Sequence, residues 1–138
     1  MRAFLLGRGE WIIRLDRGEE AVAALTRFAR AKRLRGAMLA GLGSLKDPVL
    51  AYYDLGKKRY LEQRFRGLYE VAGLTGNIAT TKGAPVLHCH VVIGGKNLKA
   101  YAGHLMRGEA GGTLEVVLRK TQPLKRSRDA RTGLNLLA

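Results

Sequence analysis

The first regular pattern of apolar residues lies near the beginning of the chain. Four apolar side chains recur there at positions i, i+3, i+6 and i+7, on one face of a helix: Val22, Leu25, Phe28 and Ala29. Glu19 and Glu20 precede this face, and three basic residues follow it: Lys32, Arg33 and Arg35. Acidic residues in the first turn and basic residues in the last turn both stabilise the helix dipole. We therefore predict an amphipathic helix that begins at Asp16 or Gly18 and ends at Gly36.

Elsewhere the chain consists of short apolar runs separated by glycine-rich turns. Strands are predicted at residues 3–6, 11–15, 37–42, 49–55, 59–65, 69–78, 86–93, 98–104 and 113–121. We expect an α+β fold in which an antiparallel (mixed) sheet of about seven short strands carries one main flanking helix. Because one helix covers only one face of such a sheet, we also expect the chain to form oligomers.

The length of 138 residues fits a single domain, 1–138, whose last part, 119–138, is a basic segment. No apolar run approaches the roughly 20 residues of a membrane-spanning helix. The N-terminal residues also lack the apolar core and the cleavage site of a signal peptide. We therefore expect a cytoplasmic protein without membrane contact. Its few Asn and Gln residues among many charged ones are typical of a thermophile.

The charge balance points to anionic partners. Lys and Arg total 25, Asp and Glu total 11, and the formal net charge is +14. Such an excess favours polyanions, above all DNA bound non-specifically through its phosphates. The candidate contacts lie on the predicted helix, on one hairpin turn and in the tail: Arg27, Arg30, Lys57, Lys58, Arg59, Lys125, Arg126 and Arg128. The simpler interpretation of each is a solvated surface charge.

All three histidines lie within one predicted hairpin. His88 and His90 are two residues apart on one strand and therefore share a face of it. A turn at residues 94–95 brings His104, on the next strand, back beside them. Imidazoles in this arrangement can hold Zn²⁺ or another divalent metal; the alternative is three histidines that are only hydrogen-bonded in a half-buried surface. Cys89 points to the opposite, apolar face, where we expect a small buried side chain.

No other set of residues carries recognisable catalytic chemistry. A cupin-type metal site needs a Glu about four residues after its His-x-His pair, but that position is Gly94, and no carboxylate occurs between His90 and Glu109. The chain has neither a nucleophile elbow nor a Walker-type phosphate-binding loop. We therefore assign no catalytic residue, and a binding protein is favoured over an enzyme.

Together these residues resemble the signature of the PPC domain (plants and prokaryotes conserved), also called domain of unknown function 296. The resemblance is carried by Leu87-His88-Cys89-His90-Val91, then Gly103-His104-Leu105, then Gly108. Further similar segments, such as Gly41-Leu42-Gly43-Ser44 and Thr132-Gly133-Leu134, extend it along nearly the whole chain. It implies a prokaryotic stand-alone member with an α+β fold that assembles as a homotrimer. In plants the domain follows AT-hook motifs in nuclear DNA-binding proteins.

The chain departs from this pattern in three ways. The Gly-Gly-His-Leu of the family is Ala102-Gly103-His104-Leu105 here, and the acidic turn often found after His-x-His is replaced by Gly94-Gly95-Lys96-Asn97. The second change removes a candidate oxygen ligand and makes the turn more basic. No AT-hook occurs, so the resemblance does not imply minor-groove binding by that route.

Three functions follow from these observations. The first is a PPC-domain DNA-associated protein: a basic homotrimeric binding module with a three-histidine metal site. The alternative is a metal-dependent small-molecule-binding protein or enzyme that uses His88, His90 and His104. In either case Glu70 or Asn77, on a predicted neighbouring strand, is expected to orient an imidazole. The third is an assembly module without any ligand.

Overall fold

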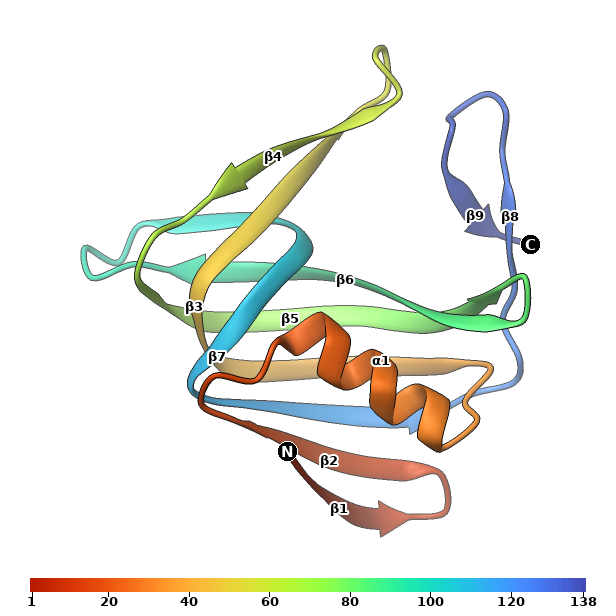
Figure 1. The fold of residues 1–138 in the computed structure, drawn as a ribbon, viewed down its shortest axis with the longest axis horizontal. Helices are drawn as coiled ribbons and strands as arrows, with labels where there is room; N and C mark the ends of the chain where they lie inside the picture. Colours follow the sequence, from red (N-terminus) through yellow and green to blue (C-terminus); the bar gives the residue numbers. More distant parts are fainter.

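The computed structural model describes residues 1–138 and consists mainly of β-strands (Figure 1). The elements follow in the order β1 (Arg2–Gly7), β2 (Glu10–Asp16), α1 (Ala21–Ala31), β3 (Ala37–Asp54), β4 (Arg59–Arg64), β5 (Leu68–Thr81), β6 (Ala84–Gly94), β7 (Ala100–Lys120), β8 (Arg126–Arg128) and β9 (Asn135–Leu137). Seven antiparallel strands form one sheet in the order β1-β2-β7-β6-β5-β3-β4, and β8 and β9 form a separate hairpin. The predicted antiparallel sheet with one helix is therefore confirmed.

The helix is shorter than the apolar pattern predicted. Its N-cap is Glu20, whose carboxylate accepts hydrogen bonds from the backbone N–H groups of Val22 (3.1 Å) and Ala23 (2.6 Å). It therefore begins at Ala21, not at Asp16 or Gly18. It ends before Gly36 because Arg33 adopts a left-handed conformation with φ of 51°. Its apolar face packs against one side of the sheet, as Figure 1 shows.

Two strands are much longer than predicted. β3 has 18 residues and β7 has 21, and each joins two of the predicted short strands. Bulges within β3 let it bend and pair with β4, β5 and β7 along its length. At Gly43, which has φ of 138°, the backbones of β3 and β7 approach closely. Only glycine fits there, because a Cβ would overlap the carbonyl of Thr113. Glycines that predicted turns thus mark bends inside continuous strands.

The residues of the sheet divide into a buried and an open face. Leu39, Leu114 and Val116 belong to a core of 23 buried residues between the helix and the sheet. The opposite face of β3 exposes Met38 and Leu42, which are 54% and 60% exposed. No helix of the structure combines the length and the apolar character that crossing a membrane requires.

The C-terminal tail returns to the sheet and passes beside the β5–β6 turn, where it forms the β8–β9 hairpin (Figure 1). The hydroxyl of Tyr53 on β3 donates to the carbonyl of Thr132 (2.8 Å), and Lys58 Nζ donates to the carbonyl of Ala130 (2.9 Å). Thr80 on β5 pairs with Lys125 in an isolated bridge. These contacts hold the β8–β9 hairpin beside the histidine strand.

Candidate metal centre

The hairpin of β6 and β7 brings the three histidines together. His90 and His104 are direct partners in the strand pairing, and His88 lies on the same face of β6 as His90. The ring centroids of the three imidazoles are 5.0 to 5.5 Å apart. One nitrogen from each ring lies within 4.8 Å of the other two. Three rings from two strands therefore converge on one point.

The surroundings of the rings keep two of them neutral. Burial, reinforced by the neighbouring His88, His90 and Arg126, lowers the pKa of His104 to about 4. Burial and then the Arg126 charge also lower the pKa of His88. His104 is stacked on Tyr60, with ring centroids 5.0 Å apart, and its Nδ1 is buried without a hydrogen-bond partner. A neutral imidazole with an unused lone pair is the form that binds a metal ion.

Arg126 is the polar neighbour of the cluster. Its Nη2 donates to Asn77 Oδ1 (2.7 Å) and lies 3.2 Å from His88 Nδ1. Because a guanidinium can only donate, His88 Nδ1 is the acceptor in this contact, and the proton of the neutral ring is on Nε2. Asn77 thus acts on His88 through Arg126 and not by direct contact, which differs from the role expected for it.

Glu70 does not reach the cluster. It pairs with Gly94 at the start of β5, whereas Asn77 pairs with His88. Seven residues of extended strand separate Glu70 from Asn77, or about 23 Å at 3.3 Å per residue. The expected role for Glu70 is therefore wrong, because a position on the neighbouring strand does not fix the position along it.

The donor set fits a divalent transition metal. Three imidazole nitrogens are a known ligand set for Zn²⁺ and leave one coordination position open. The unpartnered Nδ1 of His104 is a buried polar atom that such an ion would satisfy. Cys89 is on the other face of β6, buried in the core, where burial raises the pKa of its thiol to about 12. It is not a ligand.

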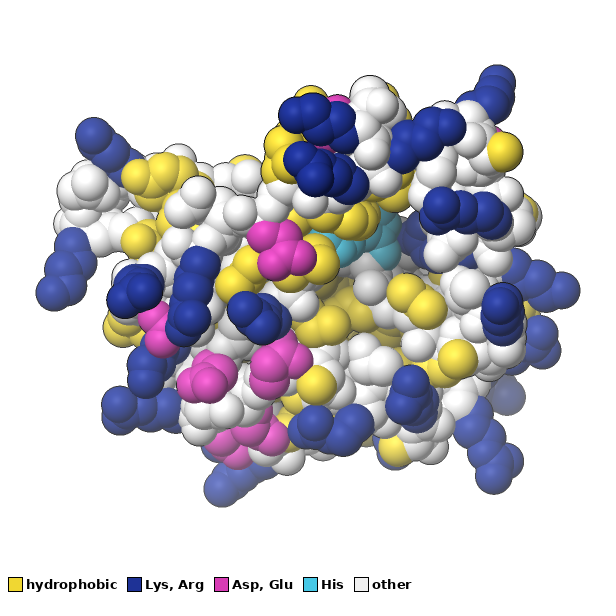
Figure 2. All heavy atoms as spheres, turned by 45° about the horizontal axis from the view of Figure 1, so that its top comes forward, with side chains coloured by type: hydrophobic (Ala, Val, Ile, Leu, Met, Phe, Trp, Pro, Cys, Tyr) yellow, Lys and Arg dark blue, Asp and Glu magenta, His cyan; other side chains and the backbone are white.

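A cavity of about 480 Å³ opens beside the cluster, with His88 and His104 in its wall. Figure 2 shows the histidines inside a hollow whose edges carry Lys and Arg side chains. Four basic residues and no acidic residue line this cavity: Lys58, Arg59, Arg126 and Arg128. Tyr53, Tyr60 and Leu87 contribute apolar surface. We refer to it as the histidine pocket.

A family model described as the Plants and Prokaryotes Conserved (PCC) domain matches residues 7–122. The chain belongs to this family. The resemblance found in the sequence, where the same family is called PPC, is therefore confirmed. The search of curated proteins gave no match.

Solved structures of PPC-like proteins are similar over almost their whole length. A PPC protein from Pyrococcus horikoshii is 31% identical, with 98% of this chain and 94% of that chain covered and a TM-score of 0.89. A metal-containing protein from Archaeoglobus fulgidus is 29% identical, with 98% and 96% covered and a TM-score of 0.87. A candidate DNA-binding protein from Bacteroides thetaiotaomicron is 27% identical, with 99% and 96% covered and a TM-score of 0.95.

In this PPC chain the basic residues chosen as nucleic-acid contacts lie on three separate elements. Arg27 and Arg30 are exposed on α1, Lys57 and Lys58 lie in the β3–β4 turn, and Arg59 begins β4. The other three, in the tail, are Lys125, Arg126 and Arg128. Arg126 turns toward the pocket and donates to Asn77 Oδ1. Four of the eight residues line the histidine pocket, so their charge also has a local explanation.

Several residues of the pocket, Tyr53, Tyr60 and Thr81 among them, were not assigned to a site from the sequence. Tyr53, Tyr60 and Thr81 come from β3, β4 and β5, and each joins the pocket only because these strands and the tail close around β6. Their spacing carries no signal, since none belongs to a motif. The basic tail residues and the resemblance at Thr132-Gly133-Leu134 indicated that the tail matters, but not that it lies beside the histidines.

Proposed function

We propose that this PPC-family protein binds one divalent metal ion through His88, His90 and His104. The observation that carries the proposal is the convergence of three ring nitrogens within 4.8 Å. Zn²⁺ suits these ligands, and other first-row metals that accept imidazole do so as well. The description of the similar Archaeoglobus fulgidus protein as metal-containing supports the proposal.

When bound, such an ion supplies a positive charge and an open coordination position. The protein's own residues prepare the site. Tyr60 stacks on His104 and fixes its ring, and the strand pairing of His90 with His104 fixes the distance between the two ligands. Burial keeps His88 and His104 neutral at pH 7, so no proton has to leave either ring before binding.

Metal binding at His88 has one structural consequence. If the ion takes Nδ1, Arg126 loses its acceptor. If the ion takes Nε2, the ring proton moves to Nδ1 and faces the Arg126 donor, which is 3.2 Å away. In both cases the Arg126–His88 contact must break. Arg126 would therefore compete with a metal ion for His88 and would lose this contact if an ion were held there.

The test is the metal content of protein purified without chelator. Wild-type protein should hold about one ion per chain, and the triple variant His88→Ala, His90→Ala, His104→Ala should hold almost none. Glu70→Ala is the matched control, since it removes a potential ligand at the far end of β5 and should leave the metal content unchanged. Equal metal in wild type and triple variant would exclude the site.

A second candidate function is non-specific DNA association by a homotrimer. The net charge of +14 supports phosphate binding, and similar proteins from Bacteroides thetaiotaomicron and Ralstonia eutropha are described as candidate DNA-binding proteins. A mobility-shift titration at low and moderate salt tests it. Binding by phosphate contacts should be measurable near ~50 mM salt and fall steeply by ~200 mM. Absence of a shift at the lower salt would argue against DNA binding.

The open face of the sheet supports the self-association that the homotrimer requires. Met38 and Leu42 on β3, with Val117 on the paired β7, form an exposed apolar surface. Burying such a surface against another copy is favourable by the hydrophobic effect. Light scattering after size exclusion should give three times the chain mass. The double variant Met38→Ser, Leu42→Ser should shift it to the mass of one chain.

A further inference from the structure

Three buried side-chain atoms of the protein have no hydrogen-bond partner, and all three belong to residues that line the histidine pocket. They are Thr81 Oγ1, His104 Nδ1 and Arg126 Nε. Buried polar atoms in folded proteins are nearly always bonded, because an unsatisfied one keeps its full desolvation cost. Their gathering in one cavity therefore indicates that the partner is a ligand. A metal ion would satisfy His104 Nδ1 but not Arg126 Nε, because a guanidinium nitrogen can only donate a hydrogen and needs an acceptor.

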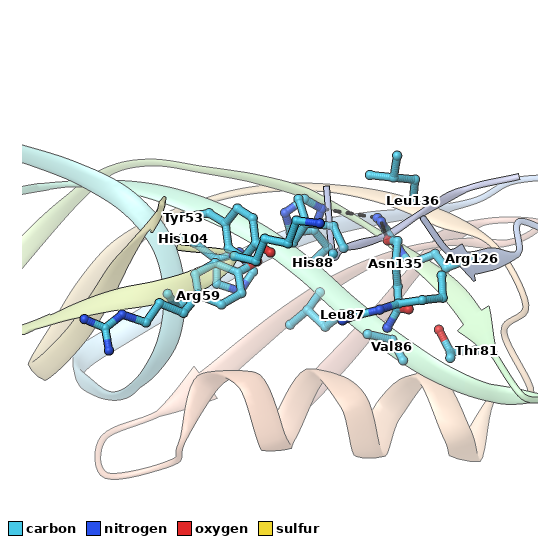
Figure 3. Close-up of a pocket in the computed structure, with 15 residues that line it drawn as sticks. Tyr53, Arg59, Thr81, Val86, Leu87, His88, His104, Arg126, Asn135 and Leu136 are labelled. Carbon is cyan, nitrogen blue, oxygen red and sulfur yellow. Dashed lines mark hydrogen bonds between the residues drawn. The ribbon is translucent and has the colours of Figure 1, made fainter. Parts of the chain in front are cut away.

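The charge of the pocket selects the kind of ligand. The guanidinium of Arg126 donates to the side-chain oxygen of Asn77 and to the carbonyl of Asn135, and neither acceptor carries a full charge. No carboxylate forms a salt bridge with it, and none lines the pocket. Figure 3 shows Arg59 pointing away from the histidines, whereas Arg126 Nη2 lies 3.2 Å from His88 Nδ1. A part-buried cation without an anion calls for an anionic ligand.

The side chains in the pocket wall indicate the character of the uncharged part of the ligand. Tyr53 and Tyr60 meet edge to face with centroids 4.9 Å apart, and Leu87 and Leu134 add apolar surface. A volume of about 480 Å³ is that of a small-molecule site and far exceeds the ~30 Å³ of a water molecule. The ligand that fits has an apolar body next to its anionic group.

We infer that the histidine pocket binds a small organic carboxylic acid whose carboxylate is held by Arg126 and Thr81 and whose apolar part lies against the tyrosines. Two free donors, one N–H and one O–H, match the two oxygens of a carboxylate. Thr81 lies on the Arg126 side of the pocket in the view of Figure 3. This inference goes beyond the proposed metal site and does not require a bound ion, because Arg126 Nε is free in the metal-free protein.

The test uses benzoate as the probe and benzamide, which has the same shape but no charge, as its control. Both are titrated calorimetrically into full-length protein treated with EDTA. We expect saturable benzoate binding and at least ~10-fold weaker benzamide binding, as for the loss of a charged hydrogen bond. Equal binding of the two would overturn the inference, and so would no benzoate binding up to about 10 mM. Since the protein is metal-free, this result is independent of whether the histidines hold an ion.

A third probe, phenyl phosphate, separates the two common anionic groups. Binding weaker than that of benzoate supports a carboxylate site with two donors. Binding more than ~10-fold tighter would overturn the carboxylate assignment in favour of a phosphate monoester, since a phosphate has more charge and a further oxygen for the other pocket cations.

Two variants connect the binding to the named residues. Arg126→Gln should weaken benzoate binding at least ~10-fold, and the exposed Arg27→Gln, with the same charge change, should leave it unchanged. Thr81→Val should weaken it about 5-fold. Because the Thr81 hydroxyl bonds to no protein atom, Thr81→Val should keep the stability of the wild type and remains informative if Arg126→Gln unfolds. Unchanged benzoate affinity in Thr81→Val and in folded Arg126→Gln would overturn the inference.

Discussion

The two faces of β6 alternate residue by residue and yet have opposite chemistry. Cys89, Val91 and Ile93 point into the core, where each is at most 2% exposed. His88 and His90 lie on the other face with His104, and His88 lines the histidine pocket. One face contributes to stability by packing, and the other presents two of the three clustered imidazoles. In this strand the contrast separates the residues that maintain the fold from those available for binding.

The largest effect is expected from a substitution on the core face of β6. Ile93→Ala should lower the free energy of unfolding by about 3 kcal/mol, because it leaves a cavity in a packed interior. Val92→Ala, on the adjacent and 41% exposed residue, should cost less than about 1 kcal/mol. Urea denaturation measures both values. Similar losses for the two variants would mean that the faces of β6 are not distinct.

The next largest effect concerns the face of β6 that carries the histidines, and it is the stabilisation of the fold by zinc. Zinc at a concentration 100 times its Kd should raise the unfolding free energy by about 2.7 kcal/mol, because only the folded protein brings the ligands together. Exposed His90 contributes one of three ligands, so His90→Ala should remove most of this gain and leave the metal-free stability nearly unchanged. Thermal unfolding with zinc and with EDTA measures the difference. A gain of the same size in His90→Ala would place the zinc elsewhere.

A smaller effect follows from the neutral form of His104. Its pKa falls from 6.5 to about 4 on folding, so between these values the unfolded chain takes up a proton that the folded chain does not. Stability is therefore lost as the pH falls through this window. Allowing for the half-exposed ring, we expect a loss of about 1 kcal/mol between pH 7 and pH 5. His104→Asn should lack this component when metal-free protein is unfolded with urea at the two pH values.

The smallest effect concerns the tail that closes the pocket. Tyr53→Phe removes the hydrogen bond to the Thr132 carbonyl and should loosen the β8–β9 hairpin by about 0.5–1 kcal/mol. Amide exchange should rise in the hairpin, at residues 126–137, and stay unchanged in β6 beyond its contact with the tail. Exchange that rises equally in the core strands would show that the tail and the sheet unfold together.

Part of the site could be read from spacing alone. Residues two apart on a strand share a face, so the convergence of His88 and His90, and the burial of Cys89 on the other side, follow from local geometry. The hairpin that returns His104 is also local, since its turn has little freedom. For the same reason the helix was found, although its ends depend on Glu20 as a cap and on the conformation of Arg33, which the apolar pattern does not show.

The sequence by itself thus determined the antiparallel class, the single helix, the family and the set of three histidines. Only the tertiary structure decided that β3 and β7 are long bent strands, that Glu70 is remote and that Arg126 faces His88. The physical reason is the distance along the sequence between residues that touch in the fold. Periodicity indicates which side of an element is buried, whereas the side-chain partners of Arg126, which are His88 and Asn77, lie 38 and 49 positions away. The positive charge that seemed to belong to the surface is, at Arg126, part of the pocket.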